Sequence, residues 1–286
     1  MTDKYRERVC NGYDHLLTID ERLYEVRTDY QHLLIFKNRT FGRILALDGV
    51  IQTTEADEFI YHEMMVHVPI LAHGSVRRVL IIGGGDGAML REVLRHGEIE
   101  QVVQVEIDQS VIELCLKYLP NHSNGAFNDT RAHLVIDDGL RFLKQTDKRF
   151  DVILTDSTDP EGPAAMLFSE QYYAACKGCL TPGGVLVTQN GVAFLQLDEV
   201  RSSAIHFKAL FRDWHFFTAA IPTYAGGIMV FGWASDNPKL RQHRLQTVQQ
   251  RFSRSGITTR YYTPDIHRCA FALPQYILEA IGKSSR

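Results

Sequence analysis

Carboxylates stand at the ends of four successive predicted strands of this 286-residue chain. Asp86, Glu106, Asp138 and Asp156 each follow an apolar run that is typical of a buried strand. Because ligands of open α/β sheets bind outside the carboxyl ends of the strands, we expect these acids to face one cleft. Asp is also a favoured helix N-cap, but four recurrences favour a site for a cation and a nucleoside over a series of caps.

A glycine-rich loop, Gly83–Gly87, carries the first of these acids. It lies between a predicted strand and a predicted helix, where glycine lets the backbone turn tightly and approach a ligand. Its spacing fits both a dinucleotide fingerprint and a nucleoside-sulfonium loop, and either would use Glu106 to bind ribose hydroxyls. Asp86 favours the second ligand, because a carboxylate in the loop repels a pyrophosphate and attracts a cation.

The elements that position these residues alternate between strands and helices from residue 76 onward. The predicted strands are 76–83, 101–107, 132–136, 150–156, 184–189, 214–221 and 227–234. The predicted helices are 88–96, 109–118, 139–145, 169–180, 196–211, 238–254 and 274–281. This alternation predicts an α/β fold with a doubly wound, mostly parallel sheet that ends in an edge hairpin.

Residues 23–53 predict a separate, antiparallel β-structure. Asp48-Gly49 is a strong two-residue hairpin signal between two apolar runs. Thr54–Asp57 loosely matches a capping box, so a helix is expected to follow, and Pro69 predicts a kink or an early end in it. We therefore divide the chain into an N-terminal β domain with a connecting helix, residues 1–70, and a catalytic domain, residues 71–286.

Composition excludes several classes of protein. The net charge of -3 lacks the basic excess of a nucleic-acid binder, and no apolar run reaches the ~18 residues of a membrane helix. The N-terminus lacks the apolar segment of a signal peptide, so we expect a cytoplasmic protein. Cys176 and Cys179 have no second pair, and His62 and His67 are five residues apart, so we predict no metal site.

The sequence closely resembles the spermidine synthase (polyamine aminopropyltransferase) family of bacterial type, from about residue 20 to residue 278. The matching segments are Gln31, Leu47–Gln52, Asp57–Met64, Gly83–Gly87, Glu106–Asp108, Asp138-Gly139, Asp156–Pro160, Gly162-Pro163, Ile221–Tyr224, Arg260–Tyr262, His267 and Ala270–Pro274. The resemblance implies a small N-terminal β domain on a methyltransferase-like Rossmann domain with seven strands. It also implies a homodimer or homotetramer.

The implied reaction moves an aminopropyl group from decarboxylated S-adenosylmethionine, a co-substrate, to putrescine, with no cofactor. By matching motif, the nucleoside would be held by Gln31, Glu106, Asp138, Gly139 and Pro163. Asp86 would bind the aminopropyl amine, and the polyamine path would also be lined by His62, Ser157, Thr158 and Asp159. Asp156 would accept the proton, assisted by Tyr61 and Tyr224.

The chemistry of the reaction supports these roles independently. An amine must be neutral to attack a sulfonium-activated carbon, yet alkyl ammonium groups have pKa values near ~10. The positive sulfur of the donor lowers that pKa, and a hydrogen-bonded carboxylate can take the released proton. Two alternatives stay open: an S-adenosylmethionine methyltransferase, whose substrate carboxylate Asp86 would repel, and a non-catalytic polyamine-binding protein.

Three departures from the family pattern bear on the acceptor. Tyr5 stands where many members have Trp, Ala165-Met166 where Glu-Ser is frequent, and His32 where an acid is common. Loss of a carboxylate and gain of a flexible apolar side chain predict looser selectivity, because apolar walls discriminate weakly between diamines. We therefore expect cadaverine or another diamine to be used at a rate comparable to putrescine.

Overall fold

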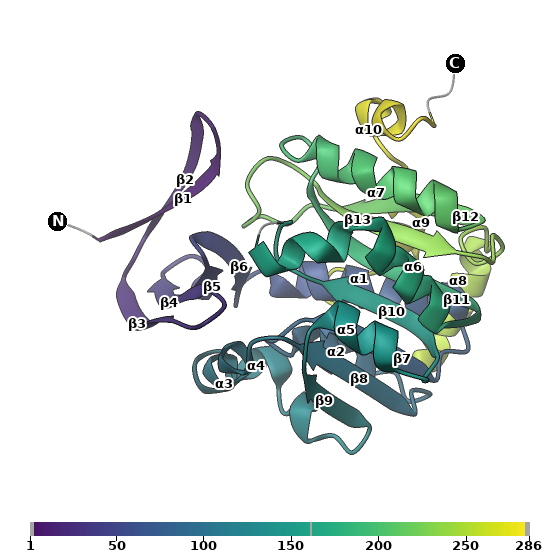
Figure 1. Cartoon of the computed structure of the whole chain (residues 1–286), viewed down its shortest axis with the longest axis horizontal. Coiled ribbons are helices and arrows are strands. Elements are labelled where there is room, and N and C mark those ends of the chain that lie inside the picture. Colours follow the sequence, from purple (N-terminus) through teal and green to yellow (C-terminus); the bar gives the residue numbers. More distant parts are fainter. Residues whose placement is uncertain (1–2, 161, 284–286) are drawn as a thin grey trace.

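The N-terminal part of the chain is β-structure, which stands beside the main body of the molecule (Figure 1). The computed structural model describes residues 3–160 and 162–283, and for residue 163 it describes the backbone alone. Strands β1 (Lys4–Cys10) and β2 (Tyr13–Thr18) form a hairpin. Strands β3 (Glu21–Arg27), β4 (His32–Asn38), β5 (Gly42–Leu47) and β6 (Val50–Thr54) form an antiparallel sheet in sequence order.

A seven-stranded sheet forms the main body, as predicted. Its strands are β7 (Arg78–Gly83), β8 (Gln101–Glu106), β9 (Ala132–Ile136), β10 (Phe150–Asp156), β11 (Leu180–Val192), β12 (Asp213–Ala219) and β13 (Met229–Ser235). Their order is β12-β13-β11-β10-β7-β8-β9, and β7 to β11 run parallel. The hairpin of β12 and β13 is antiparallel at one edge, which confirms the predicted edge hairpin.

Helices cover both faces of this sheet (Figure 1). One face carries α1 (Glu58–His73), α2 (Ala88–Leu94), α8 (Leu245–Ser255) and α9 (Pro264–Ala270). The other carries α5 (Gly139–Gln145), α6 (Glu170–Cys179), α7 (Leu197–Leu210) and α10 (Gln275–Ala280). Successive residues of β7 alternate between the two cores, Val79 and Ile81 toward the first and Leu80 and Ile82 toward the second, as strand geometry requires.

The small β domain packs against the helix that follows β8. Leu33 and Leu45 of its sheet share a buried cluster with Val111 and Cys115 of α3 (Gln109–Tyr118). After α3 come α4 (Pro120–Ser123) and a 3₁₀ turn at Ala126–Asn128, and a second such turn spans Gly162–Phe168. None of the described helices has the length and apolar character needed to cross a membrane.

The structure corrects several predicted elements. Helix α1 runs through Pro69 to His73, so the predicted early end is wrong; the boundary at residue 70 falls inside this helix and stays a prediction. The helix begins at Glu58 with Asp57 as its N-cap residue, but the side chain of Asp57 accepts from the hydroxyl of Thr54 and from Thr223 and forms no capping hydrogen bond. The hairpin β1–β2 and helix α9 were not predicted, and the predicted helix 238–254 is shortened to α8.

Candidate active site

Asp156 lies at the carboxyl end of β10, where it pairs with Gly83 of the parallel neighbour β7. The strand order reverses between these two strands, which is where doubly wound sheets bind ligands. Oδ1 of Asp156 accepts a hydrogen bond from the hydroxyl of Tyr61 at 2.7 Å. Burial raises the pKa of Asp156 to about 6, against the lowering effect of the His62 charge and with a further rise from Asp86. Such a carboxyl group can take up and release a proton near neutral pH.

The glycine loop touches this carboxyl group directly. Gly83 has a φ of 85°, and a methyl group on it would lie 2.0 Å from the backbone oxygen of Asp156. A methyl group on Gly84 would lie 3.1 Å from Oδ2 of the same residue. The amide of Gln104 fixes the loop by donating to the carbonyls of Gly83, at 3.0 Å, and Gly84, at 2.6 Å. Only glycine permits this close approach.

Asp86 links the glycine loop to helices α1 and α2. Its Oδ1 accepts from the backbone N–H of Ala88 at 2.9 Å, so part of its role is to cap α2. Its Oδ2 lies 3.6 Å from Nε2 of His62, whose Nδ1 is 2.7 Å from Oε2 of Glu58. Burial alone would lower the pKa of His62, but Asp86 and Glu58 raise it to about 9. This pKa favours the imidazolium form of the ring at neutral pH.

Glu106 stands at the end of β8, on the side of the loop opposite to Asp156. Its Oε1 accepts from the backbone N–H of Asp108 at 3.0 Å, and a methyl group on Gly85 would lie 3.1 Å from Oε2. Burial raises the pKa of Glu106 to about 7, although hydrogen bonds from two backbone N–H groups oppose this rise. Gln31 reaches the same region from the β3–β4 turn and donates to Oδ2 of Asp108 at 3.1 Å.

Asp138 is the N-cap of α5, where its Oδ1 accepts from the backbone N–H of Arg141 at 2.7 Å. Gly139 begins that helix against β7, because a methyl group on it would lie 2.6 Å from Cγ2 of Ile82. Asp138 therefore has the capping role that Asp commonly plays. The next residue lies where the helix closely approaches the sheet.

The segment after β10 carries the remaining predicted residues. The carbonyl of Thr158 accepts from Gln189 at 3.2 Å, and the buried Oγ of Ser157 has no hydrogen-bond partner among the described residues. Burial and then neighbouring carboxylates, including Asp159, raise the pKa of Tyr224. The side chain of Pro163, predicted to contact the nucleoside, lies outside the described residues.

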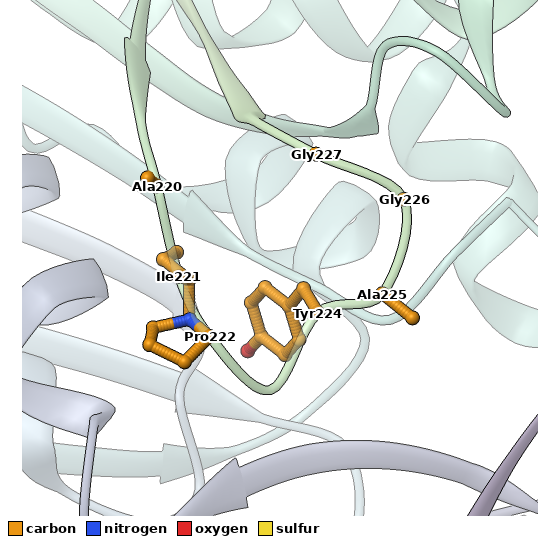
Figure 2. A pocket seen from close by; sticks show the side chains of 7 residues that line it. All are labelled: Ala220, Ile221, Pro222, Tyr224, Ala225, Gly226 and Gly227. Atoms are coloured by element: carbon orange, nitrogen blue, oxygen red, sulfur yellow. The ribbon is translucent and has the colours of Figure 1, made fainter.

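Tyr224 belongs to the loop that joins β12 to β13. Figure 2 shows its ring pointing back toward Pro222, beside a hollow of about 230 Å³ lined by residues 220–222 and 224–227. Its hydroxyl donates to the carbonyl of Gln52 at 2.6 Å, and its ring lies edge-on to that of Tyr61, 6.1 Å between centroids. The structure thus brings Tyr61, but not the hydroxyl of Tyr224, into contact with Asp156.

The chain matches the profiles of two known protein domains. The family profile described as "Spermine/spermidine synthase domain" matches residues 58–244, and "Spermidine synthase tetramerisation domain" matches residues 4–55. The chain belongs to the spermine/spermidine synthase family. This confirms the resemblance inferred from the sequence.

Individual relatives agree with this membership over nearly the whole chain. A polyamine aminopropyltransferase 1 from Pseudomonas aeruginosa is 61% identical over 279 residues, 98% of either chain. A polyamine aminopropyltransferase from Klebsiella pneumoniae strain 342 is 56% identical over 278 residues, 97% of either chain. This member of the spermine/spermidine synthase family is therefore an enzyme of the polyamine aminopropyltransferase class, as predicted.

Solved structures of the spermine/spermidine synthase family share the fold. A spermidine synthase crystallised with the transition-state analogue AdoDATO has 34% identity and a TM-score of 0.93, over 98% of this chain and 95% of that one. Spermidine synthase from Thermotoga maritima has 32% identity and a TM-score of 0.90, over 98% and 94%. The predicted fold class, a small β domain on a Rossmann-like sheet, is confirmed.

Three residues of this spermine/spermidine synthase site were not predicted. Glu58 of α1 contacts His62, and Arg91 of α2 contacts Glu58. Gln104 donates a hydrogen bond to the glycine loop. Glu58 precedes His62 by four residues on one helix face, which is a detectable signal for a side-chain pair. Arg91 and Gln104 reach the site only through tertiary packing, so sequence spacing gives no signal for them.

Proposed function

We propose that this enzyme transfers the aminopropyl group of decarboxylated S-adenosylmethionine to putrescine or a similar diamine. The products would be spermidine, when putrescine is the acceptor, and methylthioadenosine. The observation that carries the proposal is the half-buried carboxyl group of Asp156, hydrogen-bonded to Tyr61 and facing a glycine loop that contains Asp86. A cationic donor and a cationic acceptor both fit a site with two carboxylates.

In the proposed reaction, the neutral amine of the diamine attacks the carbon bonded to the sulfonium sulfur. A nitrogen–carbon bond forms as the carbon–sulfur bond breaks, and the sulfur keeps the electron pair as a neutral thioether. The proton lost by nitrogen goes to Asp156, whose pKa of about 6 leaves it mostly ionised at neutral pH. Because the sulfonium already activates the carbon, the proposed step needs neither a metal nor a redox cofactor.

The proposed binding roles are those expected from the sequence, and the positions of the carboxylates support them. Glu106, beside Gly85, would accept hydrogen bonds from the ribose hydroxyls, and the nucleoside would also be bound by Gln31, Asp138, Gly139 and Pro163. Asp86 would bind the amine of the aminopropyl group. The diamine would lie along Asp156–Asp159. We also propose assembly as a homodimer or homotetramer, supported by the profile that names residues 4–55 a tetramerisation domain.

A comparison of two donors tests the proposal. Purified enzyme is incubated with putrescine and either S-adenosylmethionine or its decarboxylated form, and nucleoside products are separated by chromatography. We expect methylthioadenosine from the decarboxylated donor only, since Asp86 repels the carboxylate of the other. S-adenosylhomocysteine from S-adenosylmethionine would indicate a methyltransferase instead. Binding of putrescine without product from either donor would indicate a non-catalytic polyamine-binding protein.

A further inference from the structure

A buried row of alternating charges leads from Asp86 into the contact between α1 and α2. Nε2 of His62 faces Oδ2 of Asp86 at 3.6 Å, and its Nδ1 faces Oε2 of Glu58 at 2.7 Å. The same Glu58 oxygen accepts from Nη2 of Arg91 at 2.9 Å. The side chains of His62 and Glu58 are only 4% and 10% exposed, and that of Arg91 is 15% exposed. Solvent therefore screens these charges weakly.

Arg91 fixes the outer end of this row. Its Nη2 also donates to Oε1 of Glu58 at 3.1 Å, and its Nε donates to Glu92 at 2.9 Å. Its Nη1 donates to the carbonyls of Asn121, at 3.1 Å, and His122, at 2.6 Å. The guanidinium is thus held by carboxylates on two helices and by the backbone of α4. Glu58 in turn cannot rotate away from His62 without giving up two hydrogen bonds from Arg91 in a weakly solvated place.

The surroundings of His62 require the charged form of its ring. Each ring nitrogen faces a carboxylate oxygen, and only the imidazolium has a proton on both nitrogens. The charged groups that act on the ring are Glu58 of α1, Asp86 of the glycine loop and Asp156 of β10. Tyr61 lies edge-on to the ring, His122 of α4 feels its charge, and Arg91 of α2 reaches it through Glu58. The three carboxylates outweigh the two cationic or titratable nitrogen groups among these neighbours, which favours a positive ring.

We propose that Glu58 and Arg91 are positioning residues that hold His62 as an imidazolium against Asp86. The positive ring of His62 then orients the Asp86 carboxylate that binds the substrate amine through their ion-pair contact at 3.6 Å, rather than accepting a hydrogen bond from the polyamine itself. Its positive charge also favours the ionised form of Asp156, because the His62 charge lowers the pKa of that carboxyl group. This inference rests on the proposed function, since it assigns a role within the same site.

The protonation state of His62 tests the proposal without depending on turnover. Protein labelled with ¹⁵N-histidine is titrated by NMR, and the His62 signals are assigned by their loss in His62→Gln. We expect both ring nitrogens to carry protons in the wild type at pH 7.5. Glu58→Gln removes the carboxylate that faces Nδ1 of His62, so the midpoint of the His62 titration should fall by roughly 1 pH unit or more. Glu58→Asp keeps the charge and should return the midpoint most of the way to its wild-type value.

Glu63→Gln is the matched control on the same helix. Glu63 is more buried than Glu58, but it accepts from the backbone N–H groups of Arg260, Tyr261 and Tyr262, each at 2.8 Å, and forms no hydrogen bond with His62. The control should lower thermal stability and leave the His62 titration unchanged. In Glu58→Gln, kcat/KM for the diamine should follow the fraction of His62 that is protonated, so relative to the wild type it should fall roughly tenfold per pH unit between the lowered midpoint and the wild-type one, while methylthioadenosine affinity changes less than about twofold.

Distinct results would overturn the inference and the proposed function. A neutral His62 ring in the wild type at pH 7.5, or a titration that Glu58→Gln and Glu58→Asp leave unchanged, would overturn the inference. An equal fall of the midpoint in Glu63→Gln would also overturn it, because the effect would then be a general loosening of α1. A wild type that makes no methylthioadenosine would overturn the proposed function, while the NMR result would still decide the charge of His62.

Discussion

Two carboxyl groups with raised pKa values, the half-buried Asp156 and the buried Glu106, set the chemistry at the scale of single residues. Burial raises the pKa of Asp156 to about 6 and that of Glu106 to about 7. Both proposed roles need the ionised form, so activity and nucleoside binding should decline as the pH falls through these values. The effect of pH on stability has the opposite sign. The pKa of each group is higher in the folded protein than in the unfolded chain, so each group stabilises the folded state fully below about pH 4. This stabilisation is lost as the pH rises through 6 to 7.

Asp156→Asn should abolish most turnover and spare the fold. The amide keeps the shape of the side chain, and its oxygen can still accept from Tyr61, but it cannot take a proton. Loss of a general base typically costs ~10²–10⁴-fold in kcat. Because the variant also removes a buried charge, its melting temperature at pH 8 should equal or exceed that of the wild type. Near-normal kcat in a variant with this melting behaviour would refute the assignment.

Glu106 should make nucleoside binding depend on pH. Titration calorimetry with methylthioadenosine should show affinity rising about tenfold per pH unit below pH 7 and levelling off above it, as the carboxylate forms. Glu106→Gln should bind more weakly at pH 8 and lose this dependence, since each charge-assisted hydrogen bond contributes ~1.5–3 kcal/mol. The same affinity at all pH values in the wild type, or an unchanged affinity in the variant, would contradict the role.

At the scale of elements, the large sheet was predictable because its central strands are buried on both faces. Parallel strands covered by helices are continuous apolar runs, and β10 matches its predicted bounds. The edge strand β9 and helix α5 also match theirs, although β9 is largely exposed. The hairpin β1–β2 was missed because only Tyr5 and Glu7 of its Lys4–Arg8 segment face inward, between exposed basic residues. Helix α9 did have a signal, Thr263 as N-cap before Pro264, but it is too short for a clear apolar period.

The candidate site was predictable only in part, because only some of its contacts follow from the topology of the sheet. Parallel topology brings the carboxyl ends of strands together, so Asp156, Asp86 and Glu106 could be grouped from sequence. Contacts between distant loops could not, because their geometry depends on the final packing of the chain. The hydrogen bond from Tyr224 to Gln52, which joins residues 172 positions apart, is one such contact.

Gly83→Ala should disrupt both stability and activity. The residue has a φ of 85°, and its methyl group would lie 2.0 Å from the backbone oxygen of Asp156, so the end of β10 must move. Backbone strain of this kind costs about 1–3 kcal/mol, and kcat should fall because Asp156 is displaced. Gly97→Ala is the control, since its methyl group meets nothing within 4 Å. Chemical denaturation and activity assays that show Gly83→Ala equal to this control would contradict the account.

At the scale of the whole molecule, the site is completed by both parts of the chain. The small β domain supplies Gln31, which reaches Asp108, and the carbonyl of Gln52, which holds Tyr224. The N-terminal departure from the family pattern lies farther inside that domain: Tyr5 is buried and packs against Phe36, 4.9 Å between ring centroids. Any effect of Tyr5 on the acceptor must therefore pass through the packing of the β domain.

Acceptor selectivity should be looser than is usual in the family. Ala165 and Met166 are exposed in the 3₁₀ turn after β10, where the family often has Glu and Ser. Without a charge at this position, putrescine and cadaverine should give kcat/KM values within about tenfold, as an apolar wall discriminates by roughly 1–3 kcal/mol per methylene. Ala165→Glu/Met166→Ser should restore preference for one diamine. A wild-type preference above ~100-fold that the double variant leaves unchanged would refute this.

The most direct test of the central claim is the mass balance of a single reaction. Isotopically labelled putrescine and decarboxylated S-adenosylmethionine are incubated with the wild type and with Asp156→Asn, and products are quantified by mass spectrometry. We expect labelled spermidine and methylthioadenosine in equal amounts from the wild type, and a loss of ~10²-fold or more of both from the variant. Methylthioadenosine without spermidine, or undiminished spermidine from a folded Asp156→Asn variant, would contradict aminopropyl transfer at this site.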